Sequence, residues 1–170
     1  MKTALFSPVR VERILSRLAY EVIERNRGGD ALVVLGIRSK GLVLAERLAQ
    51  LIGEVEGRAF DVYGLDIQPF RDDRDRSKPL PTALPGFPEV GGCDVLLVDD
   101  VLFTGRTARA AVEAVLHHGR PRSVQLAVLI DRGHREVPIQ PDYVGRTIPT
   151  KYQERVQVEL AEQTSVFLEE

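Results

Sequence analysis

The sequence predicts an α/β fold in which helices flank a mostly parallel central sheet. Three runs are almost entirely apolar, as expected of strands buried on both faces, and they lie at residues 31–37, 95–98 and 124–130, the last of which contains Gln125. Apolar residues recur with helical spacing in the segments 11–26, 42–52 and 105–118. Strands that alternate with helices imply right-handed crossovers and parallel pairing.

The composition fits one intracellular domain over residues 1–170. The chain is 44% hydrophobic, which is enough for a sizeable core, and its net charge of −2 excludes a protein that is basic as a whole. Cys93 is the single cysteine, so no internal disulfide can form. No run approaches the roughly 18 apolar residues of a membrane helix. We therefore expect a cytoplasmic protein without membrane partners.

The remaining segments are shorter or less regular. A strand is expected at residues 58–67, and short strands are expected around 143–144, 156–160 and 166–168. Residues 68–88 contain five prolines and a dense run of alternating charges, which predict a long exposed loop. Such loops in compact domains are uncommon and are often mobile lids, so we expect a flexible loop here.

Ligands of parallel α/β sheets bind at the carboxyl ends of strands, here the turns at 36–41, 99–107 and 131–135. In the second turn, Asp99 and Asp100 follow a buried strand, and Thr104–Thr107 (TGRT) opens a helix. A helix start offers unpaired N–H groups and partial positive charge to a phosphate, and Gly105 lets the backbone approach it. The acids would repel phosphate, so we expect them to bind sugar hydroxyls or a metal through water.

Each half of this pattern has another interpretation. An Asp-Asp pair at a strand end also occurs in receiver domains, where it holds magnesium, and Thr-Gly can be an ordinary N-cap. The two halves in register favour a sugar phosphate, because a receiver-like domain leaves residues 104–107 unexplained. The turn at 38–40 has two cations and flanking glycines that suit a diphosphate, but it can also be an exposed βα turn.

Residues 95–107 resemble the signature of type I phosphoribosyltransferases for 5-phosphoribosyl-1-pyrophosphate (PRPP). More of the chain resembles the PyrR family, the regulators of pyrimidine operons that are also uracil phosphoribosyltransferases. The stretches that carry this resemblance are 24–26, 35–41, 44–49, 65–67, 71–73, 119–121, 125–136, 138–139 and 142–150. The resemblance implies the type I phosphoribosyltransferase fold, with a flexible loop over the active site.

The resemblance also implies roles for individual residues. Asp99 and Asp100 would bind the ribose hydroxyls. The 5′-phosphate would be held by Thr104, Gly105, Arg106 and Thr107, in a motif that also includes Val98, Val101, Leu102 and Phe103. A pyrophosphate loop, which often carries a non-proline cis peptide bond in these enzymes, would be formed by Arg38, Ser39 and Lys40. The flexible loop would contribute Arg71, Asp72 and Asp73, although such a charge run can also be a solvated surface. The base pocket is expected near Arg132, Val144 and Ile148.

The implied reaction converts uracil and PRPP to UMP and pyrophosphate. Mg²⁺ would bind through PRPP, with Asp99 and Asp100 as candidate ligands, and would stabilise charge on the departing pyrophosphate. No general base for uracil is evident from the sequence, so catalysis would depend on positioning and electrostatics.

PyrR resemblance further implies UMP- or UTP-dependent binding of pyrimidine-operon leader mRNA, which promotes transcription termination. Cations and rings suit phosphates and unstacked bases, and the candidates are Arg10, Arg13, Arg17, Tyr20, Arg25, His134 and Arg135. A solvated amphipathic helix carries similar charges. The chain departs from the family at Ser16 (usually Thr), Tyr20 (usually His), 68–70 (usually Thr-Leu-Tyr) and 151–153 (usually Ser-rich).

Two other functions stay open on sequence alone. One is a nucleotide-sensing RNA-binding regulator with little catalysis, which the altered loop start at Gln68-Pro69 would favour. The other is a phosphoribosyltransferase for another base, such as a purine. The family resemblance also leads us to expect a homodimer or a higher even homo-oligomer.

Overall fold

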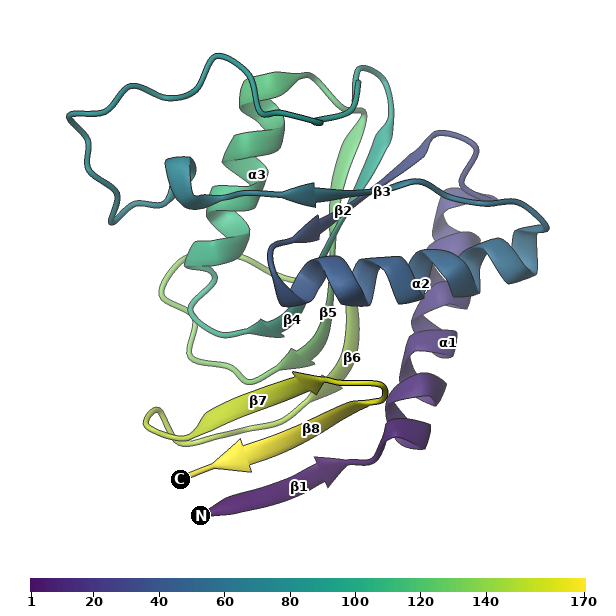
Figure 1. Cartoon of the computed structure of the whole chain (residues 1–170), viewed down its shortest axis with the longest axis vertical. Helices are drawn as coiled ribbons and strands as arrows, with labels where there is room; N and C mark the ends of the chain where they lie inside the picture. The colour runs from purple at the N-terminus through teal and green to yellow at the C-terminus, as the bar shows by residue number, and fades with distance from the viewer.

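The computed structural model describes all 170 residues and contains two β-sheets and three long helices (Figure 1). The central sheet has the order β3-β2-β4-β5-β6, and every neighbouring pair in it is parallel. Its strands are β2 (Leu32–Ile37), β3 (Val62–Leu65), β4 (Asp94–Leu102), β5 (Ser123–Asp131) and β6 (Tyr143–Thr147). The predicted α/β class with a mostly parallel sheet is confirmed.

Helices cover both faces of this sheet. The helices α1 (Pro8–Asn26) and α2 (Lys40–Glu56) pack on one face, where Leu96 and Val98 of β4 join their hydrophobic cluster. The helix α3 (Arg106–His118) packs on the other face against Val95 and Leu97. Because successive strand residues point to opposite faces, the continuous apolar run of β4 serves both layers.

The helix starts differ slightly from the expected ones. Helix α1 begins at Pro8 rather than at residue 11, because a proline is well tolerated in the first turn, where its missing N–H is not needed. It ends at Asn26, and the next residue, Arg27, has a left-handed φ of 50°. Helix α2 begins at Lys40 rather than at residue 42, so the turn before it is shorter than expected.

A buried polar network fastens α1 to the sheet. Tyr143 on β6 donates to the Gln125 side-chain oxygen at 2.6 Å, and Asn26 donates to the same atom at 3.0 Å. The Gln125 amide in turn donates to Asn26 Oδ1 at 2.8 Å. These groups are therefore paired although Gln125 is buried.

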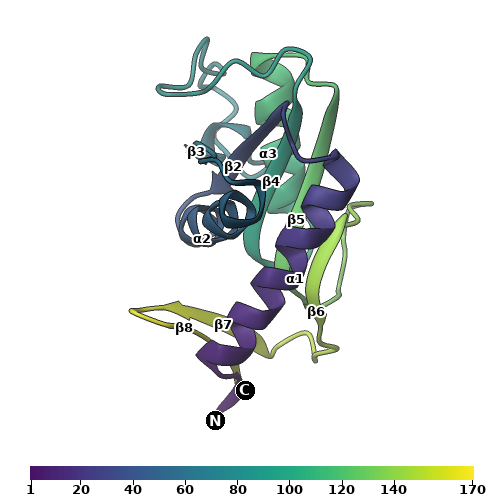
Figure 2. The same cartoon turned by 90° about the vertical axis from the view of Figure 1, so that its right-hand side faces the viewer.

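A second, antiparallel sheet joins the two ends of the chain. It has the order β1-β8-β7 and contains β1 (Lys2–Phe6), β7 (Arg155–Leu160) and β8 (Thr164–Glu169). Figure 2 shows this small sheet at one end of the molecule, where α1 starts. Strands were expected near β7 and β8 but not at β1, and the Glu170 amide donates to the Met1 carbonyl at 3.1 Å.

Two expected boundaries near the functional edge are wrong. The strand expected at 58–67 is β3 alone, Val62–Leu65. The two acids expected in a turn lie inside β4, because the strand continues beside β5 through the pairs Asp99↔Val128 and Val101↔Ile130. The segment 68–88 begins with a short 3₁₀ helix, Gln68–Phe70, and then swings out from the body beside α3 (Figure 1).

Candidate functional site

Two adjacent carboxylates lie near the carboxyl end of β4. The Asp99 side chain accepts a hydrogen bond from the Asp100 amide at 2.9 Å, and Asp100 accepts one from the Val101 amide at 2.9 Å. Burial raises the pKa of Asp99 well above its usual value, and repulsion from Asp100 raises it further. The oxygens of these two adjacent carboxyl groups can accept hydrogen bonds from the hydroxyl groups of a polar ligand.

The turn between β2 and α2 brings a cation to these acids. Lys40 Nζ lies 3.9 Å from Asp100 Oδ2. The Arg38–Ser39 peptide bond is cis, as the family resemblance led us to expect. The Arg38 guanidinium lies over Gly64 of β3, where a Cβ would come within 2.5 Å of Arg38 Nε. The cations expected in the 38–40 turn are therefore both at the functional edge, on the β2 side of β4.

Gly41 allows α2 to start directly against β4. A Cβ at this position would lie 2.4 Å from the Val98 carbonyl oxygen and 3.2 Å from Asp99 Cα. Both neighbours are backbone atoms, so a side chain here could be accommodated only if the turn moved. The distance between Lys40 and the acids is thus set by backbone contact.

The start of α3 lies next to the acids along the chain. Gly105 precedes the helix with a φ of 87°, a conformation that favours glycine, and its Cα packs beside Val137 and Ile139. The Thr104 carbonyl accepts from the Glu136 amide at 2.9 Å, which ties this turn to the segment after β5. Apart from a 3.3 Å bond from the Arg106 amide to Thr104 Oγ1, no side chain caps α3. Amides of the first turn therefore stay available for an anion.

Arg106 links three parts of this edge. Its guanidinium pairs with Asp72 from the long loop and with Glu136 at 2.8 Å. Hydrogen bonding from Arg106 lowers the pKa of Glu136. In the loop itself, Arg71 pairs with Asp73 at 2.8 Å, so its charge is engaged within the loop rather than at the acids of β4.

The three residues expected at the base pocket have different packing partners. Arg132 is buried and donates to Thr150 Oγ1 at 3.1 Å and to the Lys151 and Tyr152 carbonyls, each at 3.0 Å. Val144 packs with the α3-side cluster and Ile148 with the cluster on the opposite face. Arg132 therefore organises the segment that follows β6, and its burial lowers its own pKa.

A separate basic hollow lies on the outer side of α1. It measures about 500 Å³, and its charged lining consists of four arginines: Arg10, Arg13 and Arg17 of α1 and Arg146 of β6. Arg17 also donates to the Gly145 carbonyl at 2.6 Å, which fixes α1 against β6. Tyr20 is exposed on the same helix. Sequence reasoning missed Arg146, because only the packing of β6 beside α1 brings it to this helix.

The other candidate RNA contacts are held elsewhere. Arg25 pairs with Asp142 at 2.6 Å. His134 Nε2 lies 2.7 Å from the Thr150 carbonyl. Arg135 pairs with Asp131 at 2.6 Å and donates to the Phe103 carbonyl at 3.0 Å. In a single chain, His134 and Arg135 thus belong to the edge at the end of β5, not to the basic hollow.

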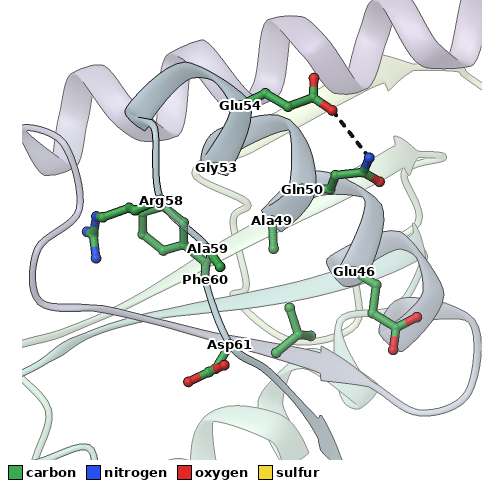
Figure 3. Close-up of a pocket in the computed structure, with 10 residues that line it drawn as sticks. Glu46, Ala49, Gln50, Gly53, Glu54, Arg58, Ala59, Phe60 and Asp61 are labelled. Atoms are coloured by element: carbon green, nitrogen blue, oxygen red, sulfur yellow. Dashed lines mark hydrogen bonds between the residues drawn. The ribbon is translucent and has the colours of Figure 1, made fainter.

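Another hollow, of about 620 Å³, has neither of the acids of β4 in its lining (Figure 3). It lies between the later turns of α2 and the segment that leads into β3, hence toward the amino end of that strand. Its lining includes three acidic side chains, Glu46, Glu54 and Asp61, and one basic side chain, Arg58. An acidic hollow at this end of a parallel sheet suits neither a phosphate nor the ligand position of such folds.

Comparison with known proteins first defines the class. The phosphoribosyl transferase domain family matches residues 3–163, so the chain belongs to that family. A crystal structure of the hypoxanthine phosphoribosyltransferase of Trypanosoma cruzi is 17% identical with a TM-score of 0.73, covering 96% of this chain and 95% of that one. A hypoxanthine-guanine phosphoribosyltransferase from Bacillus anthracis is 19% identical with a TM-score of 0.64, covering 88% and 83%. The type I phosphoribosyltransferase fold is confirmed.

Sequence relatives define the branch. "Bifunctional protein PyrR" of Alkaliphilus metalliredigens (strain QYMF) is 49% identical over 164 residues, covering 94% of this chain and 90% of the relative. The protein of the same name from Bacillus mycoides (strain KBAB4) is 45% identical over 165 residues, covering 95% and 92%. The chain belongs to the PyrR family. None of its helices has the length and apolar character needed to span a membrane.

Proposed function

We propose that the chain transfers the phosphoribosyl group of PRPP to uracil, giving UMP and pyrophosphate. One observation carries this proposal: β4 presents two adjacent acids between a cationic turn on one side and an uncapped helix start on the other. A 5-phosphorylated sugar with a pyrophosphate at C1 needs those three environments in that order. Membership of the PyrR family, whose relatives carry the name bifunctional protein, supports the same reaction.

Each group of PRPP then has a partner. Asp99 and Asp100 would bind the two ribose hydroxyls, and the amides and hydroxyls of residues 104–107 would hold the 5′-phosphate. Arg38 and Lys40 would face the pyrophosphate, where they stabilise the charge that develops as it leaves. The loop at 71–73 would close over the sugar and exclude water, which would otherwise compete with uracil.

Magnesium would arrive with PRPP rather than in a site made by the protein. No three His, Cys, Asp or Glu side chains converge to hold a metal ion, and the acid pair of β4 offers at most two carboxylates. The ion would supply charge neutralisation to the pyrophosphate oxygens. The protein groups around it would then orient PRPP and position uracil against C1.

Pyrophosphate release tests the reaction and its base. The protein is incubated with PRPP and Mg²⁺ together with uracil, hypoxanthine or guanine. Release with uracil alone is the expected result. If pyrophosphate is released with a purine base instead, that base replaces uracil as the proposed substrate. No release with any base, while UMP still binds, would favour a nucleotide-sensing regulator.

We also propose that the protein binds pyrimidine-operon leader RNA when UMP or UTP is present. The supporting observation is the four-arginine hollow beside the exposed Tyr20, in which Arg17 pairs with Glu21 at 2.6 Å and the other three arginines form no ion pair. Guanidinium groups match phosphates, and an exposed ring can stack an unpaired base. A homodimer or higher even oligomer would place two such hollows on one assembly, and light scattering on the purified protein measures its size.

A gel shift with leader RNA, titrated with salt, tests this second activity. Binding is expected to strengthen with UMP and to weaken as salt rises, because phosphate contacts release counterions. Binding that ignores both UMP and salt would contradict the proposal.

A further inference from the structure

Tyr152 is an exposed aromatic residue in a segment where the PyrR family usually has a serine-rich run. The residue is 60% exposed, and it lies in the turn between β6 and β7, which contacts the segment that follows β5. Aromatic rings this exposed lose the burial that normally stabilises them. The exposed position of the Tyr152 ring needs an explanation, which we seek in its contacts.

Three contacts fix the backbone around Tyr152. The buried Arg132 donates to the Tyr152 carbonyl at 3.0 Å. His134 Nε2 lies 2.7 Å from the Thr150 carbonyl. The Lys151 amide donates to the buried Glu154 at 2.7 Å. The turn is thus held by polar side chains of the segment that follows β5 and of the segment before β7.

The ring itself is also held in place. The Tyr152 hydroxyl donates to Glu136 Oε1 at 3.3 Å, and Glu136 is in turn paired with Arg106 at the start of α3. The Tyr152 ring centroid lies 5.4 Å from that of Phe103 and 5.6 Å from that of His134, the latter at 88°. Phe103 lies directly before Thr104, and the Arg132 guanidinium covers it at 4.0 Å. Tyr152 is the member of this aromatic group that is left open to solvent.

The chemistry of the proposed reaction selects the same side of β4. Displacement at the sugar C1 brings the base in on the face opposite to the departing pyrophosphate. The cationic turn for pyrophosphate follows β2, which lies on one side of β4, whereas β5 lies on the other side. The base must therefore approach from the β5 side, where Tyr152 stands.

We propose that the Tyr152 ring is the stacking wall for the nucleobase, and so a base-binding residue of this enzyme. The proposal rests on the proposed phosphoribosyl transfer and adds the surface that receives its base. The ligand of the Tyr152 ring must carry a flat aromatic ring, a condition that every nucleobase meets. The hydroxyl serves to orient the ring through Glu136 and does not touch the base.

Calorimetric titration with UMP tests the proposal, using the full chain and its variants Tyr152→Ala and Tyr152→Phe. Loss of the ring should weaken UMP binding about fivefold to 150-fold, a range that follows from base–aromatic stacking free energies of about 1–3 kcal/mol. The phenylalanine variant keeps the ring and should stay within about twofold of the parent. PRPP has no base, so all three proteins should bind PRPP equally, which also shows that the alanine variant is folded.

The outcomes distinguish failure of the stacking proposal from failure of the proposed phosphoribosyl transfer. UMP binding unchanged in Tyr152→Ala, with UMP and PRPP both bound by the parent, overturns the stacking wall and leaves phosphoribosyl transfer standing. A parent that binds neither ligand overturns both. A parent that binds IMP more tightly than UMP, and loses that binding in the alanine variant, supports the wall and corrects the base.

Discussion

Substitution of Gly41 by alanine should separate catalysis from stability. The added Cβ would lie 2.4 Å from the Val98 carbonyl oxygen, whereas ordinary contact begins at 3.4 Å, so the turn must move by about 1 Å. That movement carries Lys40 away from Asp100, which lies 3.9 Å from it. A misplacement of this size can cost about 100-fold in rate, so kcat/KM for PRPP should fall by that order. Overpacking should also cost about 1–3 kcal/mol of stability.

Gly53→Ala is the matched control on the same helix. Its Cβ would lie 2.5 Å from the Arg58 carbonyl oxygen, a similar backbone collision at the opposite end of α2. Both variants should unfold at lower urea concentrations, but only Gly41→Ala should lose activity. Steady-state kinetics and urea unfolding measure the two effects. The reasoning fails if Gly41→Ala keeps parental kcat/KM, or if Gly53→Ala loses as much.

Three further predictions concern stability, pH and RNA. Gln125→Leu should cost about 1–3 kcal/mol in urea unfolding, because it leaves its buried polar partners unpaired; parental stability would contradict this. Hydrogen bonding from Arg122 lowers the pKa of Asp94 in the folded protein. The charged Asp94 therefore stabilises the fold fully above its unfolded-state pKa of about 3.9, and this stabilisation is lost as the pH falls through the pKa of the folded state. The stability difference between the parent and Asp94→Asn should therefore shrink in acid; a constant difference down to pH 2–3, about one unit below that pKa, would count against it. Arg146→Ala should weaken leader-RNA binding and make the log–log salt slope shallower by about 0.7, whereas an unchanged slope would place Arg146 off the RNA.

The parallel core was predictable because its signal is local. The three apolar runs correspond to β2, β4 and β5. The helical spacing between them located α3 within one residue and the start of α2 within two, whereas α2 continues to Glu56, four residues beyond its expected end. Strand β1 was missed because its five residues are mostly exposed and gain their order only by pairing with β8. Pairing between chain ends, such as Lys2↔Glu169, leaves no local pattern.

The candidate site likewise has some features that local sequence predicts and others that depend on tertiary packing. The acids, the cationic turn and the helix start were predictable, because parallel strands end at one edge of the sheet. Their exact setting was not: Asp99 and Asp100 lie within β4, since β5 continues to pair beside them. The base pocket near Arg132, Val144 and Ile148 stays a prediction, since Val144 and Ile148 pack against clusters on opposite faces of the sheet. Tyr152 stood out in the sequence only as a departure, and its aromatic neighbours come from separate segments.

The most direct test of the central claim is the dissociation constant of PRPP with Mg²⁺ for the parent and for Asp100→Asn. The claim is that the acids of β4 hold the ribose beside the phosphate-binding start of α3. Removal of one charged acceptor should weaken PRPP binding by about tenfold or more, since hydrogen bonds to charged groups contribute about 1.5–3 kcal/mol. Inorganic pyrophosphate, which has no ribose, should bind both proteins alike. PRPP binding unchanged in Asp100→Asn would contradict the sugar site, and no PRPP binding by the parent would contradict the whole account.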